Sequence, residues 1–250
     1  MKFCHQLIII NRYTDKMRYI LKVGFLLTIL FGAVSALAND TYKLKFHDFN
    51  ELTVVDDINV DYICDPSKAG MVEFEAPKNL VSSIIFEPSK TKLSIKLAAS
   101  DSVYRELPTI KVYSSYLTSV KNDGDSLVRV LSVADGPKFS CRVIGNGKII
   151  VQDVKTNELS ASIFAGNGKI TIYGECKVAN LKVTGSGTIQ AEELKSLEAN
   201  CTASHGSIYC NAVEKLSVGG VSGNVYYRGT PELKKRFLAH IKLTQLESNK

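Results

Sequence analysis

The sequence predicts an all-β fold: a single-stranded, right-handed parallel β-helix, or solenoid, with a C-terminal capping α-helix. The first observation is a Gly-x-Gly unit that recurs about every twenty residues in the second half of the chain. A fixed period of this length is typical of a solenoid, in which each coil buries its apolar face only by stacking on its neighbours. The copies are Gly145-Asn146-Gly147, Gly166-Asn167-Gly168 and Gly185-Ser186-Gly187, with fainter ones at His205-Gly206-Ser207 and Ser222-Gly223-Asn224.

The second observation is that apolar and polar residues alternate after each unit. This period of two is typical of a short strand with one face turned inward. Stacking the coils in register gives one inward column: Ile149, Ile170, Ile189, Ile208 and Val225. A second strand in each coil is expected to give another: Leu159, Leu181, Leu197 and Leu216. Apolar corner residues are expected between the two strands: Val154, Val178, Leu194 and Val213.

The third observation excludes two other solenoids. A leucine-rich repeat needs a fixed Leu-x-x-Leu-x-Leu-x-x-Asn run, which the sequence lacks. A left-handed β-helix needs strict hexapeptides, which are also missing. The right-handed parallel β-helix is the architecture that remains.

Residues 1–38 have the pattern of a secretory signal peptide. Basic residues precede an apolar run over residues 23–37, and the run ends in Ala36-Leu37-Ala38. The run is shorter than a membrane-spanning helix, which disfavours an uncleaved anchor. Met17 gives a leader of ordinary length and is the expected start. We therefore expect an exported protein of the periplasm, cell surface or extracellular space, with no transmembrane segment after cleavage.

The charge of the chain depends largely on this leader. The whole chain has a formal net charge of +6. The leader holds five basic residues and one acidic residue, so cleavage removes four of these charges. The remaining charge of about +2, with no basic cluster interleaved with aromatic residues, disfavours a nucleic-acid partner.

Five cysteines remain after cleavage: Cys64, Cys141, Cys176, Cys201 and Cys210. An odd number leaves at least one free thiol or an intermolecular bond. The spacing fits no metal-binding or redox motif. Cys210 falls in an inward column beside Ala191, which indicates a small buried core residue. We expect no metal and no cofactor.

The regular coils are expected over residues 121–229. Residues 41–120 carry less regular strands punctuated by prolines, and they are expected to form the first coils and an end cap. The remaining residues, 230–250, differ in kind and predict the capping helix.

In that last segment, Thr230 is suited to the N-cap and Pro231 to the first helical position. Leu233, Phe237 and Ile241 recur at helical spacing, so one face would be apolar. Such a helix would cover the open edge of the last coil, which is otherwise a template for aggregation.

The repeated units together resemble a known family. The residues that carry the resemblance are Gly145-Asn146-Gly147-Lys148-Ile149, Gly166-Asn167-Gly168-Lys169-Ile170, Val183-Thr184-Gly185-Ser186-Gly187-Thr188-Ile189 and Val225-Tyr226-Tyr227-Arg228-Gly229-Thr230-Pro231. Over roughly residues 46–231 the chain resembles the auto-transporter adhesin head domain, also called the GIN domain, a family without assigned biochemistry. The resemblance implies a secreted or surface-exposed bacterial β-helix with an adhesive role. It implies no catalytic residue.

One corner of the predicted coils carries acidic residues: Asp153, Glu175 and Glu193. Carboxylates one coil apart could share a Ca²⁺ ion. Lysines occupy nearly the same corner: Lys155, Lys177, Lys195 and Lys215. The interpretation we favour is a set of ion pairs between coils, with no metal site.

A second polar column follows the tips of the glycine turns. Stacked amides can hydrogen-bond along a ladder, and the same side chains could meet sugar hydroxyls. Tyr209 and Tyr226 could add an aromatic patch, whereas Tyr227 continues an inward column and is expected to plug the last coil. The candidate ligand-facing residues are Asn146, Asn167, Ser186, His205 and Tyr226.

The sequence thus favours an exported, non-enzymatic binding or adhesion-type module for a protein or glycan. The alternative is a carbohydrate-active β-helix enzyme that resembles a polysaccharide lyase and uses the corner carboxylates. A third hypothesis is an envelope chaperone or signalling accessory protein that uses the predicted C-terminal capping helix.

Overall fold

A computed structural model describes residues 39–99 and 107–247, apart from the side chain of residue 238. The chain divides into two units, Met1–Asn39 and Asp40–Lys250. The predicted signal peptide, residues 1–38, lies outside the described residues. The second unit is a β-solenoid of about six turns with 69% strand and 3% helix, so the all-β prediction is confirmed. Within the described residues, no helix is both long enough and apolar enough to span a membrane.

The first part of this unit combines parallel coils with antiparallel strands. β1 pairs with β4, and β5 with β6, in antiparallel fashion, whereas β2 and β3 pair only with parallel neighbours. A short 3₁₀ turn and a one-turn helix connect some of these strands. The elements are β1 (Asp40–Lys45), β2 (Glu51–Val55), β3 (Val60–Cys64), η2 (Pro66–Lys68), β4 (Met71–Ala76), α2 (Lys78–Val81), β5 (Ile84–Ser89), β6 (Lys92–Leu97) and β7 (Ile110–Ser114).

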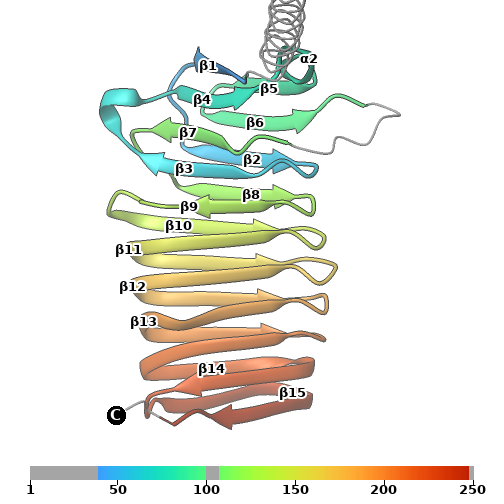
Figure 1. Cartoon of the computed structure of the whole chain (residues 1–250). Coiled ribbons are helices and arrows are strands. Elements are labelled where there is room, and N and C mark those ends of the chain that lie inside the picture. Colours follow the sequence, from blue (N-terminus) through green and yellow to red (C-terminus); the bar gives the residue numbers. More distant parts are fainter. Residues whose placement is uncertain (1–38, 100–106, 248–250) are drawn as a thin grey trace, which may run out of the picture. The chain divides into compact units, whose positions relative to one another are not determined.

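The second part is a regular stack of parallel rungs (Figure 1). Each rung pairs in parallel with the rung before it and the rung after it. The backbone hydrogen bonds therefore run along the solenoid axis, as the repeat predicts. The strands are β8 (Ser119–Asp123), β9 (Leu127–Val130), β10 (Gly136–Val143), β11 (Lys148–Ile163), β12 (Lys169–Val183), β13 (Thr188–Ala203), β14 (Ser207–Arg228) and β15 (Glu232–Gln245).

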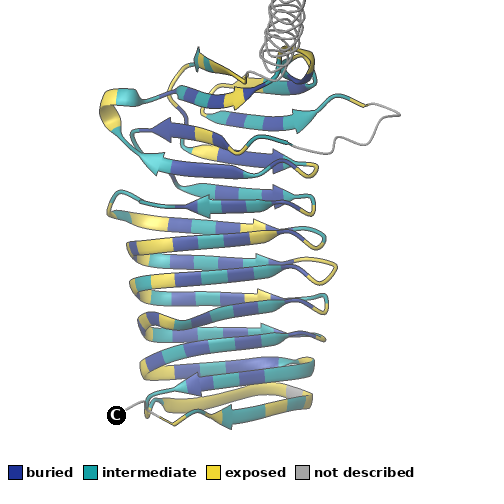
Figure 2. Cartoon of the chain, viewed as in Figure 1, coloured by how far each residue is buried: buried dark blue, intermediate teal, exposed yellow. Residues whose placement is uncertain are grey.

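The first predicted inward column is confirmed. Register pairs Ile149 with Ile170, and Ile170 with Ile189. Every member of the column has no solvent-exposed surface: Ile149, Ile170, Ile189, Ile208 and Val225. Along the strands, buried residues alternate with more exposed ones (Figure 2). The inner face of the tube is therefore a continuous apolar core.

The second predicted column is wrong in register. Leu159 stacks on Ala179, whereas Leu181 lies two positions further along its rung and stacks on Ala161. Leu197 is not in the core at all, and 39% of its surface is exposed. The reason is that the rungs differ in length at the corner, where β-bulges absorb the difference and shift the phase of the second strand.

The same shifts divide the predicted corner residues. Val154 and Leu194 are buried, as expected. Val178 is half-buried, and Val213 is 43% exposed. The buried corner column consists instead of Thr156, Cys176 and Ser196, which stand opposite one another in register.

The predicted C-terminal helix over residues 230–250 is also wrong. The segment Glu232–Gln245 forms strand β15, which pairs in parallel with β14. An edge of β14 presents unpaired N–H and C=O groups, and a further strand satisfies them where a helix could not. The helical spacing of Leu233 and Phe237 therefore builds no apolar helix face, and these side chains are 40% and 69% exposed.

The five cysteines of the described residues are free thiols. Cys210 is 1% exposed, so the prediction of a buried core residue is confirmed. Its Sγ lies 3.7 Å from Sγ of Cys201, which is also fully buried. The hydrogen bond between these thiols and their burial raise the pKa of Cys201 well above its ordinary value.

Candidate ligand-binding surfaces

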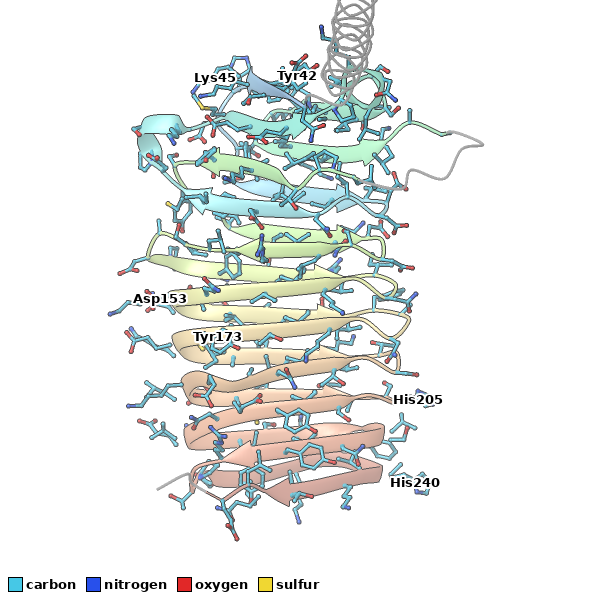
Figure 3. The ribbon with its side chains drawn as sticks, in the orientation of Figure 1. Tyr42, Lys45, Asp153, Tyr173, His205 and His240 are labelled. Carbon is cyan, nitrogen blue, oxygen red and sulfur yellow. The ribbon has the colours of Figure 1, made fainter. Side chains whose placement is uncertain are left out.

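Four of the five candidate residues lie along one edge of the stack. We call Asn146, Asn167, Ser186 and His205 the turn edge, because each follows a rung at the tip of its turn, and all four are exposed. Figure 3 shows His205 projecting outward from this edge, with His240 nearby on the same side. The chain thus presents one polar side chain per rung along a straight line.

The turn edge is partly a hydrogen-bonded ladder. The backbone N–H of Asn167 donates to Oδ1 of Asn146 over 3.1 Å. Nδ2 of Asn146 in turn donates to Oδ1 of Asp125, one rung earlier, over 3.2 Å. At the next rung the ladder changes to backbone, since the N–H of Ser186 donates to the carbonyl of Gly166 at 2.9 Å. The side chain of Asn167 has no hydrogen-bond partner among the described residues, so its amide is available to a ligand.

Glycine at the turns sets the spacing of this edge. Gly166 has φ +72°, and a Cβ there would overlap the carbonyl oxygen of Gly145 in the rung above. The turns therefore stack backbone on backbone. This packing keeps successive turn-edge side chains about 4.8 Å apart, the spacing between strands of a sheet.

Tyr226 belongs to a different surface. It lies on the outer face of β14 and stacks on Tyr209, with ring centroids 4.5 Å apart and an angle of 14° between the rings. Partial burial raises the pKa of Tyr209, and electrostatic repulsion from Tyr226 and Glu192 raises it further. Tyr227 points into the tube and is 8% exposed, in agreement with its predicted role as a plug. The structure therefore separates Tyr226 from the other four candidates.

The corner carboxylates do not converge. Register places Glu175 opposite Lys155 and Lys195, whereas Glu193 stands opposite Tyr173. Asp153 lies in the bulge with φ +51°, at the corner where Figure 3 also shows Tyr173. No group of three or more His, Cys, Asp or Glu side chains suited to a metal ion occurs within the described ranges.

Glu175 instead forms the expected ion pair between rungs. Nζ of Lys155 lies 2.8 Å from Oε1 of Glu175. This hydrogen bond raises the pKa of Lys155 and lowers that of Glu175. Glu193 similarly pairs with Arg228 at 2.7 Å. The pair of Lys155 and Glu175 is exposed on both sides and contributes little to stability, whereas the side chain of Arg228 is half-buried.

Beside this corner lies an open groove of about 470 Å³. We call it the corner groove. Its floor is the column of Thr156, Cys176 and Ser196, and the exposed side chain of Leu197 lies at its rim. The residues that line it are Asp135, Gly136, Lys155, Thr156, Asn157, Glu175, Cys176, Lys177, Lys195, Ser196 and Leu197. Sequence reasoning missed this groove, and the recurring lysines at the corner were the only signal of it.

The thiol in the corner groove is not an activated nucleophile. Burial raises the pKa of Cys176 to about 12, so the thiol stays protonated at neutral pH. A reactive cysteine requires the opposite shift, toward the thiolate. The groove can therefore bind a ligand non-covalently, through its lysines, its hydroxyls and one exposed leucine.

The molecule is a β-solenoid with polar outward side chains in columns and an open groove at one corner. The chain belongs to the family described as "Putative auto-transporter adhesin, head GIN domain", whose model matches residues 48–231. The resemblance drawn from the glycine units is thereby confirmed. No curated protein matches the chain.

Solved structures show the same fold. A protein described as a "putative adhesin" from Bacteroides fragilis superposes with a TM-score of 0.76 at 20% identity, over 83% of this chain and 97% of that one. A "Putative lipid binding protein" from Parabacteroides distasonis gives a TM-score of 0.64 at 23% identity, over 84% and 97% of the two chains. A "putative adhesin" from Parabacteroides merdae gives 0.62 at 20% identity, over the same shares.

Proposed function

We propose that this chain is an exported, non-enzymatic module of the bacterial envelope or cell surface that attaches to a glycan or protein ligand. The observation that carries the proposal is the turn edge, where successive rungs hold polar side chains in line and exposed. A ligand with repeated polar groups meets a matching row of donors and acceptors there. The family and the adhesins of similar fold support the adhesive role.

A glycan suits this surface better than an apolar ligand. The amides of Asn146 and Asn167 both donate and accept hydrogen bonds, as sugar hydroxyls do. His205 and Ser186 extend the same row. Tyr226, stacked on Tyr209, offers a second contact area on the outer face of β14, where an aromatic ring combines apolar area with a polar hydroxyl.

The positions of the corner carboxylates on successive rungs support the non-enzymatic part of the proposal. A lyase mechanism would require Asp153, Glu175 and Glu193 to act on one substrate group, yet two of them are held in ion pairs with cations on other rungs. An assay on acidic polysaccharides should give no turnover above background. Turnover that disappears in the triple alanine variant of these carboxylates would establish the enzyme instead.

Binding is tested with the purified full chain on a glycan array and in pull-downs from envelope extracts. Asn167→Ala together with His205→Ala should weaken capture at least tenfold, since the amide of Asn167 supports no contact within the fold. Gln152→Ala is the matched control, because this exposed amide is outside the turn edge and does not line the corner groove. The proposal would be refuted if the double variant captured as much ligand as the wild type, or if the wild type captured nothing.

A further inference from the structure

A small hollow on the outer face of β8, β10 and β11 differs from the surfaces described above. Its volume is about 200 Å³. Strand pairing aligns its side chains in two columns across three rungs. Ser119, Ser140 and Ser160 form the first column. The second column holds Lys121, Arg142 and Ser162. We call these six residues the serine hollow.

Serine at three successive rungs creates the hollow, because larger side chains border it on the same face. The hydroxyls of Ser119 and Ser160 have no hydrogen-bond partner among the described residues. Ser140 donates to the carbonyl oxygen of Thr118 at 3.3 Å and holds its place. Two hydroxyls are thus available to an occupant, one on each side of the central rung.

The second column makes the hollow cationic. Lys121 is paired with Asp123 at 2.8 Å, so it contributes little net charge. Nε of Arg142 donates to the hydroxyl of Ser162 at 3.3 Å, and no carboxylate of the described residues lies within ion-pair distance of this exposed guanidinium. The remaining donors of Arg142 form a planar fork that matches a carboxylate.

An exposed aromatic side chain follows the end of β11, the last of the three rungs. Phe164 comes two residues after Ser162 on the same rung, and 65% of its surface is exposed. A ring at such a position offers apolar area to the less polar face of a sugar ring. Phe164 also lies between the serine hollow and Asn167 of the turn edge along the chain.

We propose that the serine hollow binds a carboxylate-bearing sugar of an acidic polysaccharide. Arg142 holds the carboxylate, Ser119 and Ser160 bind ring hydroxyls, and Phe164 covers one face of an adjoining sugar. The proposal rests on the proposed glycan-binding function and specifies its ligand class. Its volume, below that of a pocket for a drug-sized ligand, suits a single sugar ring.

An acidic peptide fits this site less well. Extended peptides gain affinity by adding a strand to a free sheet edge. β10 is paired on both sides, with β8 and β11, so the hollow offers no free backbone edge. The hollow also lacks an apolar pocket for a peptide side chain. The groups that the hollow offers to a ligand are serine hydroxyls and the guanidinium of Arg142.

The test uses calorimetric titration of the full chain with three acidic oligosaccharides: trigalacturonate, sialyllactose and a hyaluronan tetrasaccharide. Each is paired with its methyl ester, which has the same sugars without the charge. At least one acid should bind at least tenfold more tightly than its ester, and added salt should weaken it. Failure of all three acids to bind refutes the proposal, as does equal binding of acid and ester.

Variants assign the binding to the hollow. Arg142→Ala should lose at least tenfold in affinity, and Arg142→Lys should fall in between, since it keeps the charge and loses the fork. Lys148→Ala removes an exposed charge on the other face and should change affinity less than twofold. Thermal unfolding confirms that the variants fold. Unchanged affinity in Arg142→Ala, or equal binding of a poly-glutamate peptide, overturns the proposal.

These outcomes separate the two proposals. If neutral glycans bind and lose affinity in the Asn167→Ala variant, while none of the three acids binds, the adhesive function is sustained and the acidic-sugar site is refuted. If Arg142→Ala loses affinity for acidic sugars and Asn167→Ala does not, the serine hollow is sustained as the binding site. The turn edge would then not be the binding surface.

Discussion

Arg129 holds Asp61 through two parallel hydrogen bonds of 2.6 Å, from Nε and Nη2 to the two carboxylate oxygens. The residues are 68 positions apart and stand opposite each other on β9 and β3. The side chain of Asp61 is 9% exposed, and that of Arg129 is 43% exposed. This bidentate pair therefore links the first, less regular coils to the start of the regular stack.

Removal of this carboxylate should weaken the junction. Asp61→Ala leaves Arg129 without its partner, and we expect the free energy of unfolding to fall by about 1–3 kcal/mol, since half the pair is solvated. Urea denaturation measures the change. Glu175→Ala, which removes one partner of a fully exposed pair, should leave the midpoint nearly unchanged. Equal losses in the two variants would contradict this ranking.

Two glycines with positive φ should respond differently to alanine. Gly220 has φ +146°, and a Cβ there would overlap the carbonyl oxygen of Ala203 in the rung above. Gly145 has φ +96°, but its nearest atoms would be 3.8 Å away. We expect Gly145→Ala to cost about 1–2 kcal/mol from backbone strain alone. Gly220→Ala should cost more than about 3 kcal/mol, because a rung must also move.

Thermal and urea unfolding of the two glycine variants provide the measurement, with circular dichroism to confirm retained strand content. If Gly145→Ala proved as damaging as Gly220→Ala, close packing of rungs would not be the factor that selects glycine at these turns.

The sequence could predict the first inward column because each glycine unit marks the phase of the strand that follows it. Ile149 and Ile170 both come two residues after the second glycine, so no irregularity separates them from their reference point. The second strand lies beyond the corner, where rungs gain or lose residues in bulges. Leu197 has the right residue type, but its offset from the corner turns it outward.

The C-terminal segment could not be predicted from its own pattern. Leu233, Phe237 and Ile241 satisfy helical spacing, and the flanking Thr230 and Pro231 are suitable helix-start residues. Local preference was overridden by the strand edge that β14 presents, a tertiary feature absent from the segment itself.

The candidate surfaces also divide into one that the sequence could predict and two that it could not. Asn146 and Asn167 share one position in the glycine unit, so their alignment was predictable. The corner groove depends on Thr156, Cys176 and Ser196, which lie beyond the bulges, and Cys176 is one residue nearer to its glycine unit than the other two are to theirs. The serine hollow includes Ser119, which lies before the first clear glycine unit, so these units give no phase for it.

Alkaline pH should destabilise the fold through Cys141. Complete burial raises the pKa of this thiol from 9.0 to about 12. The folded state thus favours the neutral thiol, and its contribution is fully present below pH 9. As pH rises from 9 toward 12, the unfolded chain loses the proton first and stability falls. Urea unfolding at pH 7.5 and 10.5 should show this loss, and Cys141→Ala should reduce the slope. Identical slopes for wild type and variant would refute it.

Leu181 and Leu197 look equivalent in the sequence, since each begins the second strand of its coil, but the structure separates them. Leu181 is 1% exposed and Leu197 is 39% exposed. Leu181→Ala should lower the free energy of unfolding by about 2–4 kcal/mol, because it leaves a cavity between Ala161 and Cys201. Leu197→Ala should cost less than about 1 kcal/mol, since much of the side chain is already in water. Both values come from urea denaturation at pH 7.5. Similar losses of stability at the two positions would contradict this prediction. They would indicate that Leu197 packs inside the tube, in the same column as Leu181, as the sequence alone predicts.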